Sequence, residues 1–160
     1  MSKTSSNCWS RAALAAALAI PVLGQTPAAV LSVAEPVKVT LKRAEPAAQV
    51  LQVSLKSGFH VNSHAPNDKS LIPLKLTWET SHVEVTGIFY PTPHLEKSEF
   101  SDQPLSVFSG NFEIVSKLRR TSLAQPGPGY LAGKLRYQAC NDKMCLPPRT
   151  LEIKVPLLIE

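Results

Sequence analysis

The sequence contains few glycines, few aromatic residues and no concentrated charge. Its 160 residues include 7 glycines, aromatic residues make up 6%, and charged residues make up 18% with a net charge of +5. The excess positive charge forms no basic block apart from Arg119-Arg120. Nucleic-acid binding needs a concentrated basic face interleaved with aromatic side chains, so the composition argues against that class. The length corresponds to about one domain, and a hydrophobic share of 44% is ordinary for a globular protein.

The first residues have the pattern of a secretory signal peptide. Lys3 and Arg11 are the only charged residues of 1–24, and an apolar run, Ala12 to Ile20, follows them. This run is shorter than the ~20 apolar residues of a membrane-spanning helix. We therefore predict a signal peptide over 1–24 and a periplasmic or otherwise exported protein, with an uncleaved N-terminal anchor as the alternative. Cys8 would leave with the signal, so two cysteines would remain in an oxidising compartment.

Residues 25–36 are rich in Pro, Ala and Val and predict a flexible lead-in, which leaves 37–160 as the domain. This domain contains short segments rich in β-branched residues, separated by Pro, Gly, Asn and Asp. The apolar residues recur with period two and show no long helical spacing. Expected strands are 37–42, 49–56, 74–79, 83–89, 111–118, 130–138 and 150–158. The pattern predicts an all-β fold, an immunoglobulin-like antiparallel β-sandwich with Trp78 in its core. Longer connections are expected at 62–70 and 91–104, with a loop at 125–129.

Cys140 and Cys145 lie between two expected strands in the segment YQACNDKMCLPP. Four residues separate them, so a turn can bring them within bonding distance. As a staple, a loop this short would contribute only about 2 kcal/mol, against nearly 5 for a loop of about a hundred residues. This favours a redox role, although a structural staple stays open. A Cu(I) site using Met144 with the two cysteines is a further alternative, but the four histidines show no matching ligand spacing.

Three segments resemble the N-terminal periplasmic domain of DsbD, the thiol–disulfide interchange protein, whose family is also called the disulphide bond corrector domain. The most specific is Tyr137-Gln138-Ala139-Cys140 with Cys145 and Pro147-Pro148; the others are 58–66 and 100–110. The resemblance runs from about Val37 to Leu158. It implies an immunoglobulin-like sandwich whose cysteine pair carries two electrons.

In full-length relatives, a membrane domain takes electrons from cytoplasmic thioredoxin and passes them to a thioredoxin-like periplasmic domain. That domain reduces the sandwich, which reduces disulfide isomerases or proteins of cytochrome c maturation. For this chain the resemblance implies a protein-disulfide reductase component with no cofactor other than the redox-active Cys140–Cys145 disulfide. Because the sequence shows no membrane domain and no thioredoxin-like domain, the expected partners are thioredoxin-fold proteins and a separate membrane electron donor.

We further expect a monomer without nucleic acid and without a membrane span after signal cleavage. The alternative function is a non-catalytic exported binding module whose disulfide pins a loop.

The resemblance also suggests roles for other residues. It favours Cys145 as the residue that attacks the substrate and Cys140 as the one that resolves the mixed disulfide. Phe100, with Asp102 beside it, is expected either to cap the disulfide or to pack in the core. Gln138 is expected to orient the cysteine loop and Tyr137 to lie in the core.

Charged and polar residues near the cysteines complete the candidate site. Asp142 could oppose a thiolate or relay a proton, and Lys143 could stabilise a thiolate. Both could instead be solvated turn residues, which is the favoured interpretation for Lys143. His60 and Asn62 share a strand face by period two and could lie beside the thiols. His60 could accept a proton there or serve as a hydrogen-bonded structural group. The other histidines, 64, 82 and 94, are expected in loops without a role.

Overall fold

The structure is a computed structural model that describes residues 29–79, 82–98 and 101–160. These residues form twelve strands in three four-stranded sheets, and none of them is helical. The predicted signal peptide, Cys8 and Phe100 lie outside the described residues.

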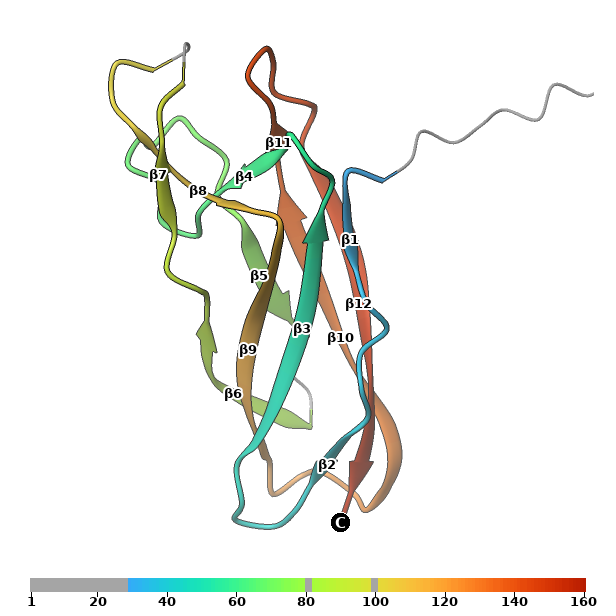
Figure 1. Cartoon of the computed structure of the whole chain (residues 1–160). Helices are drawn as coiled ribbons and strands as arrows, with labels where there is room; N and C mark the ends of the chain where they lie inside the picture. The colour runs from blue at the N-terminus through green and yellow to red at the C-terminus, as the bar shows by residue number, and fades with distance from the viewer. Residues whose placement is uncertain (1–28, 80–81, 99–100) are drawn as a thin grey trace, which may run out of the picture.

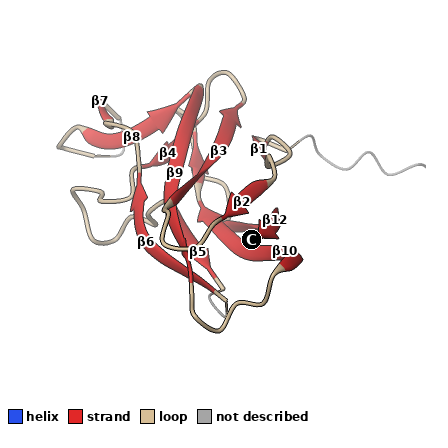
Figure 2. Ribbon diagram, turned by 90° about the horizontal axis from the view of Figure 1, so that it is seen from below, coloured by secondary structure: helices blue, strands red, loops and turns tan. Residues whose placement is uncertain are grey.

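Two of the sheets pack face to face as a sandwich (Figures 1 and 2). The first has the order β1-β3-β9-β6 and the second β2-β12-β10-β5. The strands of the first sheet are β1 (Leu31–Val33), β3 (Ala47–Leu55), β9 (Asn111–Arg120) and β6 (Val83–Phe89). Those of the second are β2 (Val39–Leu41), β12 (Arg149–Ile159), β10 (Gly127–Tyr137) and β5 (Lys75–Trp78). The prediction of an all-β, immunoglobulin-like sandwich is confirmed.

Side chains that alternate along the long strands form the core. In β3, Leu51, Val53 and Leu55 are buried while the residues between them are exposed. This is the face expected from period two, because successive side chains of a strand point to opposite sides of the sheet. Ile114 from β9 and Leu135 from β10 are also fully buried in the same cluster. Each sheet therefore contributes one apolar face to the interior.

Three features of the sandwich differ from the sequence predictions. The predicted flexible lead-in contains β1, which pairs with β3 and buries Leu31 completely. Its Pro- and Ala-rich composition concealed a short apolar alternation, Leu31 and Val33. Strand β10 starts at Gly127, inside the predicted loop. Strand β2 pairs with β12 in parallel, with Val39 opposite Leu157, so the sandwich is not wholly antiparallel.

A third, smaller sheet lies at one end of the molecule, away from β2 and the C-terminus (Figure 1). Its order is β11-β4-β8-β7, and all its pairs are antiparallel. Its strands are β11 (Ala139–Cys140), β4 (His60–Asn62), β8 (Leu105–Ser109) and β7 (His94–Glu96). One residue separates β10 from β11, and Gly110 alone separates β8 from β9 at a φ of 64°. Long strands of the sandwich are thus directly connected in sequence to strands of this end sheet, which contains Cys140.

Candidate functional site

The two cysteines close a tight hairpin that follows β11. The amide of Leu146 donates to the carbonyl of Ala139 at 2.8 Å, and the amide of Asn141 donates to the carbonyl of Met144 at 2.9 Å. Between these hydrogen-bonded pairs Cys140 and Cys145 face each other, joined by a disulfide with a Cα–Cα distance of 4.0 Å. Directly opposed residues without mutual hydrogen bonds are the closest pairs of an antiparallel ladder. The hairpin therefore brings the sulfur atoms together without help from the rest of the chain.

The tip of this hairpin is held by an asparagine that the sequence analysis did not single out. Asn141 Oδ1 accepts hydrogen bonds from the amides of Lys143 at 3.0 Å and Met144 at 2.9 Å. Asn is common in turns because its side chain can accept hydrogen bonds from nearby backbone amides. The Asn-Asp pair in the sequence was therefore the signal that could have predicted this turn. Asp142 and Lys143 themselves are exposed at the tip.

Gln138 and Tyr137 precede the hairpin and point to different surroundings. Gln138 Nε2 donates to the carbonyl of Leu146 at 3.1 Å, which ties together the two ends of the cysteine segment. Tyr137 is 3% exposed and belongs to the core cluster. Burial raises the pKa of its phenol, and the nearby Arg149 partly offsets this rise.

The two cysteines of the hairpin differ in exposure. Cys140 is 4% exposed, whereas Cys145 lies on the exposed side of the hairpin. Thiol–disulfide exchange begins with attack on an accessible sulfur. Cys145 is therefore the more accessible of the two cysteines.

Cys140 lies on one face of the end sheet, next to polar residues. It is directly opposite His60 in the β11–β4 pair, and His60 is opposite Ser109 in the β4–β8 pair. Opposed residues of antiparallel strands project to the same face, with Cβ atoms about 4.5–5.5 Å apart. The other face carries Val61 and Phe108, both members of the core cluster.

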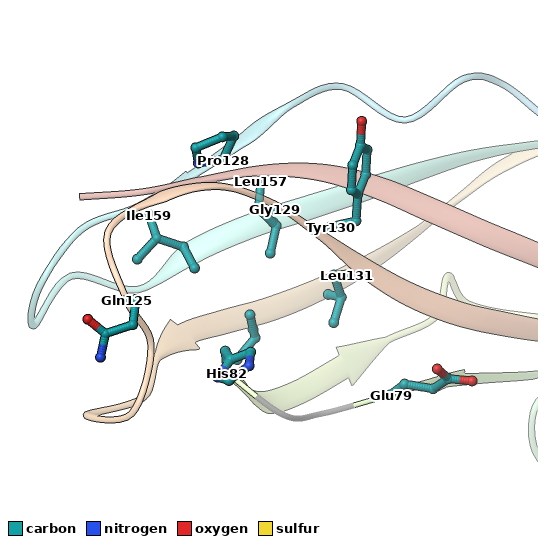
Figure 3. Close-up of a pocket in the computed structure, with 10 residues that line it drawn as sticks. Glu79, His82, Gln125, Pro128, Gly129, Tyr130, Leu131, Leu157 and Ile159 are labelled. Atoms are coloured by element: carbon teal, nitrogen blue, oxygen red, sulfur yellow. The ribbon is translucent and has the colours of Figure 1, made fainter.

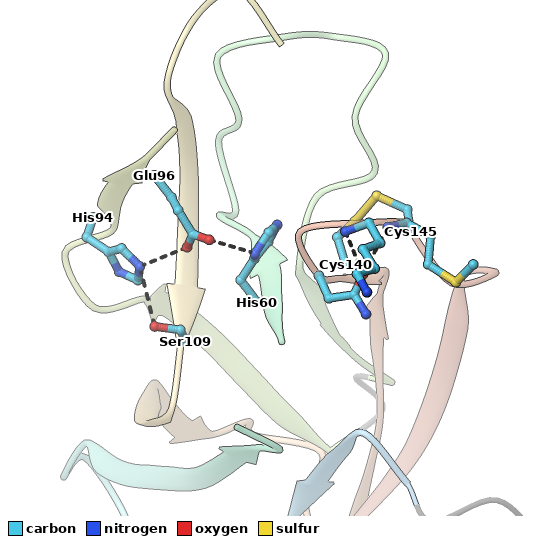
Figure 4. A network of polar contacts seen from close by, with 9 residues as sticks. His60, His94, Glu96, Ser109, Cys140 and Cys145 are labelled. Carbon is cyan, nitrogen blue, oxygen red and sulfur yellow. Dashed lines mark hydrogen bonds and ion pairs between the residues drawn. A yellow bond between two sulfur atoms is a disulfide. The ribbon is translucent and has the colours of Figure 1, made fainter. Parts of the chain in front are cut away.

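A row of polar contacts continues from His60 along this face (Figure 4). His60 Nδ1 lies 3.2 Å from Glu96 Oε1, and His94 Nε2 lies 3.6 Å from Glu96 Oε2. His94 Nε2 also lies 3.3 Å from the hydroxyl of Ser109. The prediction that His94 is a loop residue is wrong, because it belongs to β7, where its side chain contacts Glu96. Glu96 was not anticipated; its alternation with His94 inside a predicted loop was the only signal.

The remaining candidates are distributed around the end sheet. Asn62 is 1% exposed, and its Nδ2 donates to the carbonyl of Ile72 at 3.0 Å, while its Oδ1 has no hydrogen-bond partner within the described part of the chain. Asp102 is exposed and lines an open groove together with Asn67 and Pro104. Phe100, expected either to cap the disulfide or to pack in the core, lies outside the described residues.

A separate cavity of about 210 Å³ opens at the opposite end of the sandwich (Figure 3). Its lining includes His82, Glu79 and Tyr130 together with apolar residues of β10 and β12. It holds neither cysteine, so the chemistry of the hairpin does not involve it.

Within the described ranges, no group of three or more His, Cys, Asp or Glu residues is arranged to hold a metal ion. The described part of the chain also contains no helix long and apolar enough to cross a membrane.

Two solved structures are similar to the chain at low identity. The N-terminal periplasmic domain of ScsB from Proteus mirabilis shares 15% identity with a TM-score of 0.49 over 73% of this chain and 43% of that one. The chain thus corresponds to less than half of the ScsB structure. The reduced N-terminal domain of DsbD from Neisseria meningitidis shares 13% identity with a TM-score of 0.43 over 68% of this chain and 75% of that one. Among curated proteins, none matches.

A sequence model of one protein family matches residues 28–157, which span both sheets of the sandwich, the end sheet and the cysteine hairpin. The chain belongs to the family described as thiol:disulfide interchange protein DsbD, N-terminal.

Proposed function

We propose that this domain carries two electrons by dithiol–disulfide exchange between Cys140 and Cys145, in the periplasm or another exported location. The proposed donor is a thioredoxin-fold protein fed by a separate membrane protein. The proposed acceptors are disulfide-bonded proteins, such as those of cytochrome c maturation. The observation that carries this proposal is the pairing of an exposed Cys145 with a buried Cys140 in one tight hairpin.

Reduction of the domain would start when a donor thiolate attacks Cys145 Sγ. The Cys140–Cys145 bond breaks, and Cys140 leaves with the electron pair as a thiolate. A second donor thiolate then attacks the donor's own sulfur in the mixed disulfide, which releases Cys145 and leaves the donor oxidised. Two electrons have passed to the domain, and the reverse sequence passes them to an acceptor.

The surroundings of the hairpin support this role. Asn141 holds the tip of the hairpin and Gln138 joins its two ends, through hydrogen bonds to the backbone that do not require the disulfide, so the reduced form can keep its shape. Met144, 57% exposed beside Cys145, offers an apolar contact to a docking partner. Phe100 is proposed as a cap over the disulfide, Asp102 as a part of the cap loop, and Asp142 as a charge near the thiols.

Trapping of a mixed disulfide tests the proposal. In a chain with Cys8→Ser, the variant Cys140→Ser keeps only the exposed thiol, and its matched control Cys145→Ser keeps only the buried one. We expect the Cys140→Ser variant to form a stable mixed disulfide with an oxidised thioredoxin-fold protein, and the control to form little. Absence of a mixed disulfide with Cys140→Ser would overturn the proposed function.

A further inference from the structure

The buried imidazole of His60 has one nitrogen engaged and one free. The side chain is 7% exposed, Nδ1 faces Glu96 at 3.2 Å, and Nε2 is buried without a hydrogen-bond partner among the residues that the structure describes. A buried polar atom without a partner is costly and calls for an explanation. The two nitrogens lie on different sides of the ring, so Nε2 is directed away from Glu96.

The free nitrogen lies on the face of the sheet that carries Cys140. His60 and Cys140 are directly opposite each other in the β4–β11 pair, and Figure 4 shows the ring between Glu96 and the cysteines. A carboxylate at Nδ1 accepts a hydrogen bond from the Nδ1–H group, and in this tautomer the lone pair of the neutral ring is on Nε2. Nε2 is therefore ready to accept a proton from a donor on the side of the cysteines.

We propose that His60 is the proton acceptor for the Cys140 thiol when Cys140 resolves a mixed disulfide, and that Glu96 is the residue that positions it. This inference rests on the proposed function. The Cys140 thiol gives its proton to His60 Nε2, and the resulting thiolate attacks Cys145 Sγ. The Cys140–Cys145 bond forms, the bond from Cys145 to the acceptor sulfur breaks, and the acceptor leaves as a thiolate with the electron pair. The imidazolium later returns its proton to solvent.

The charges around His60 suit this role. Glu96 stabilises the imidazolium that forms, and His94 contacts the other carboxylate oxygen of Glu96. From β11 the only titratable group facing His60 is Cys140, and from β8 the facing residue is Ser109, which does not titrate in this range. Asp142 and Lys143 are exposed at the tip of the hairpin. Buried Cys140 would otherwise ionise in surroundings that disfavour a charge, because burial penalises the thiolate.

The reagent 5,5′-dithiobis(2-nitrobenzoate) separates the two steps. In the reduced chain with Cys8→Ser, Cys145 releases the first thionitrobenzoate, and resolution by Cys140 releases the second. We expect His60→Gln to slow the second release at neutral pH by about tenfold or more, within what a positioned base contributes. The first release should stay within about twofold of the parent chain, because Cys145 is exposed. His82→Gln, an exposed histidine at the other end of the sandwich, is the matched control and should leave both steps unchanged.

The pH profile distinguishes proton transfer from a structural role. In the parent chain the second release should accelerate as the pH rises, because a protonated imidazole cannot accept a proton. His60→Gln should lose this rise and keep only the one due to the thiol itself. Glu96→Gln should lower the rate by a smaller factor, since the amide can still hold the ring but lacks the charge. It also keeps the test open if His60→Gln does not fold.

An unchanged pH profile of the second release in His60→Gln would overturn this inference, and so would an unchanged rate of the second release in Glu96→Gln. Failure of the proposed function is distinguishable, because it would show as a parent chain that releases both thionitrobenzoates normally but does not exchange with any thioredoxin-fold protein.

Discussion

The body of the sandwich and the small end sheet differ in which residues of their strands are buried. In β3 and β10 of the body, buried residues alternate with exposed ones, and the buried residues are mostly apolar. In the end sheet all three residues of β4 are buried, and two of them, His60 and Asn62, are polar. Burial of apolar area stabilises a fold, whereas burial of polar groups costs free energy unless they are paired. The body therefore supplies the stability that allows the end sheet to keep buried polar groups next to Cys140.

The largest effect on stability is expected from a cavity in the body. Ile114 is fully buried in β9, and Ile114→Ala should lower the free energy of unfolding by about 2–5 kcal/mol, as deletions of large core side chains do. Denaturant unfolding measures this change. Exchange at the hairpin should persist in the folded fraction; loss of both properties together would contradict the separation of the two regions.

A smaller effect is expected where a strand approaches a tryptophan. Gly133 in β10 is opposite Trp78 in β5, and a Cβ at this glycine would overlap Trp78 Cε3 and lie 2.9 Å from the carbonyl oxygen of Thr77. Gly133→Ala should therefore destabilise the fold by about 1–3 kcal/mol through overpacking. Gly129→Ala on the same strand meets nothing within 4 Å and is the control. Equal melting temperatures for the two variants would show that the ring moves aside freely.

At the end sheet, changes to the hairpin should affect stability less. Asn141→Ala removes the acceptor of two backbone amides and should cost about 1 kcal/mol. Lys143→Ala at the same exposed tip should stay within about 0.5 kcal/mol of the parent. Thermal unfolding of the oxidised proteins checks both values. A larger loss for Lys143→Ala would show that this lysine is more than a solvated turn residue.

The smallest effect at neutral pH concerns Tyr90, which follows β6 of the first sheet and contacts β5 of the second. Its hydroxyl accepts the amide of Leu76 at 2.8 Å, and burial raises the pKa of the phenol despite that bond. The folded pKa thus exceeds the unfolded value near ~10. The contribution of the buried, protonated phenol to the free energy of unfolding is fully present below the unfolded pKa. It is lost as the pH rises through the folded pKa. Unfolding free energies measured from about pH 8 to about pH 11 should fall more steeply for the parent chain than for Tyr90→Phe. Parallel slopes would contradict the role of Tyr90.

The sequence predicted the body of the fold better than the end sheet. The long strands β3 and β9 have enough residues for period two to identify both the strand and its buried face. Strands β7 and β11, of three and two residues, are too short to show a period, and they exist because β8 and β4 pair with them.

Separation along the chain explains which site residues could be predicted. Cys140 and Cys145 are close in the sequence, so a turn alone brings them together. The contact of His60 with Glu96 joins residues far apart along the chain through the pairing of β4, β8 and β7. No local pattern encodes that register, although period two did place His60 on a strand face with Asn62.

The reduction potential of the Cys140–Cys145 pair tests the central claim most directly. The chain would be equilibrated with mixtures of reduced and oxidised glutathione, and its thiols would then be quantified by alkylation. We predict a value in the range of ~−180 to −270 mV found for thiol–disulfide oxidoreductases. A value well below about −300 mV would mark the disulfide as structural and contradict the proposed electron relay.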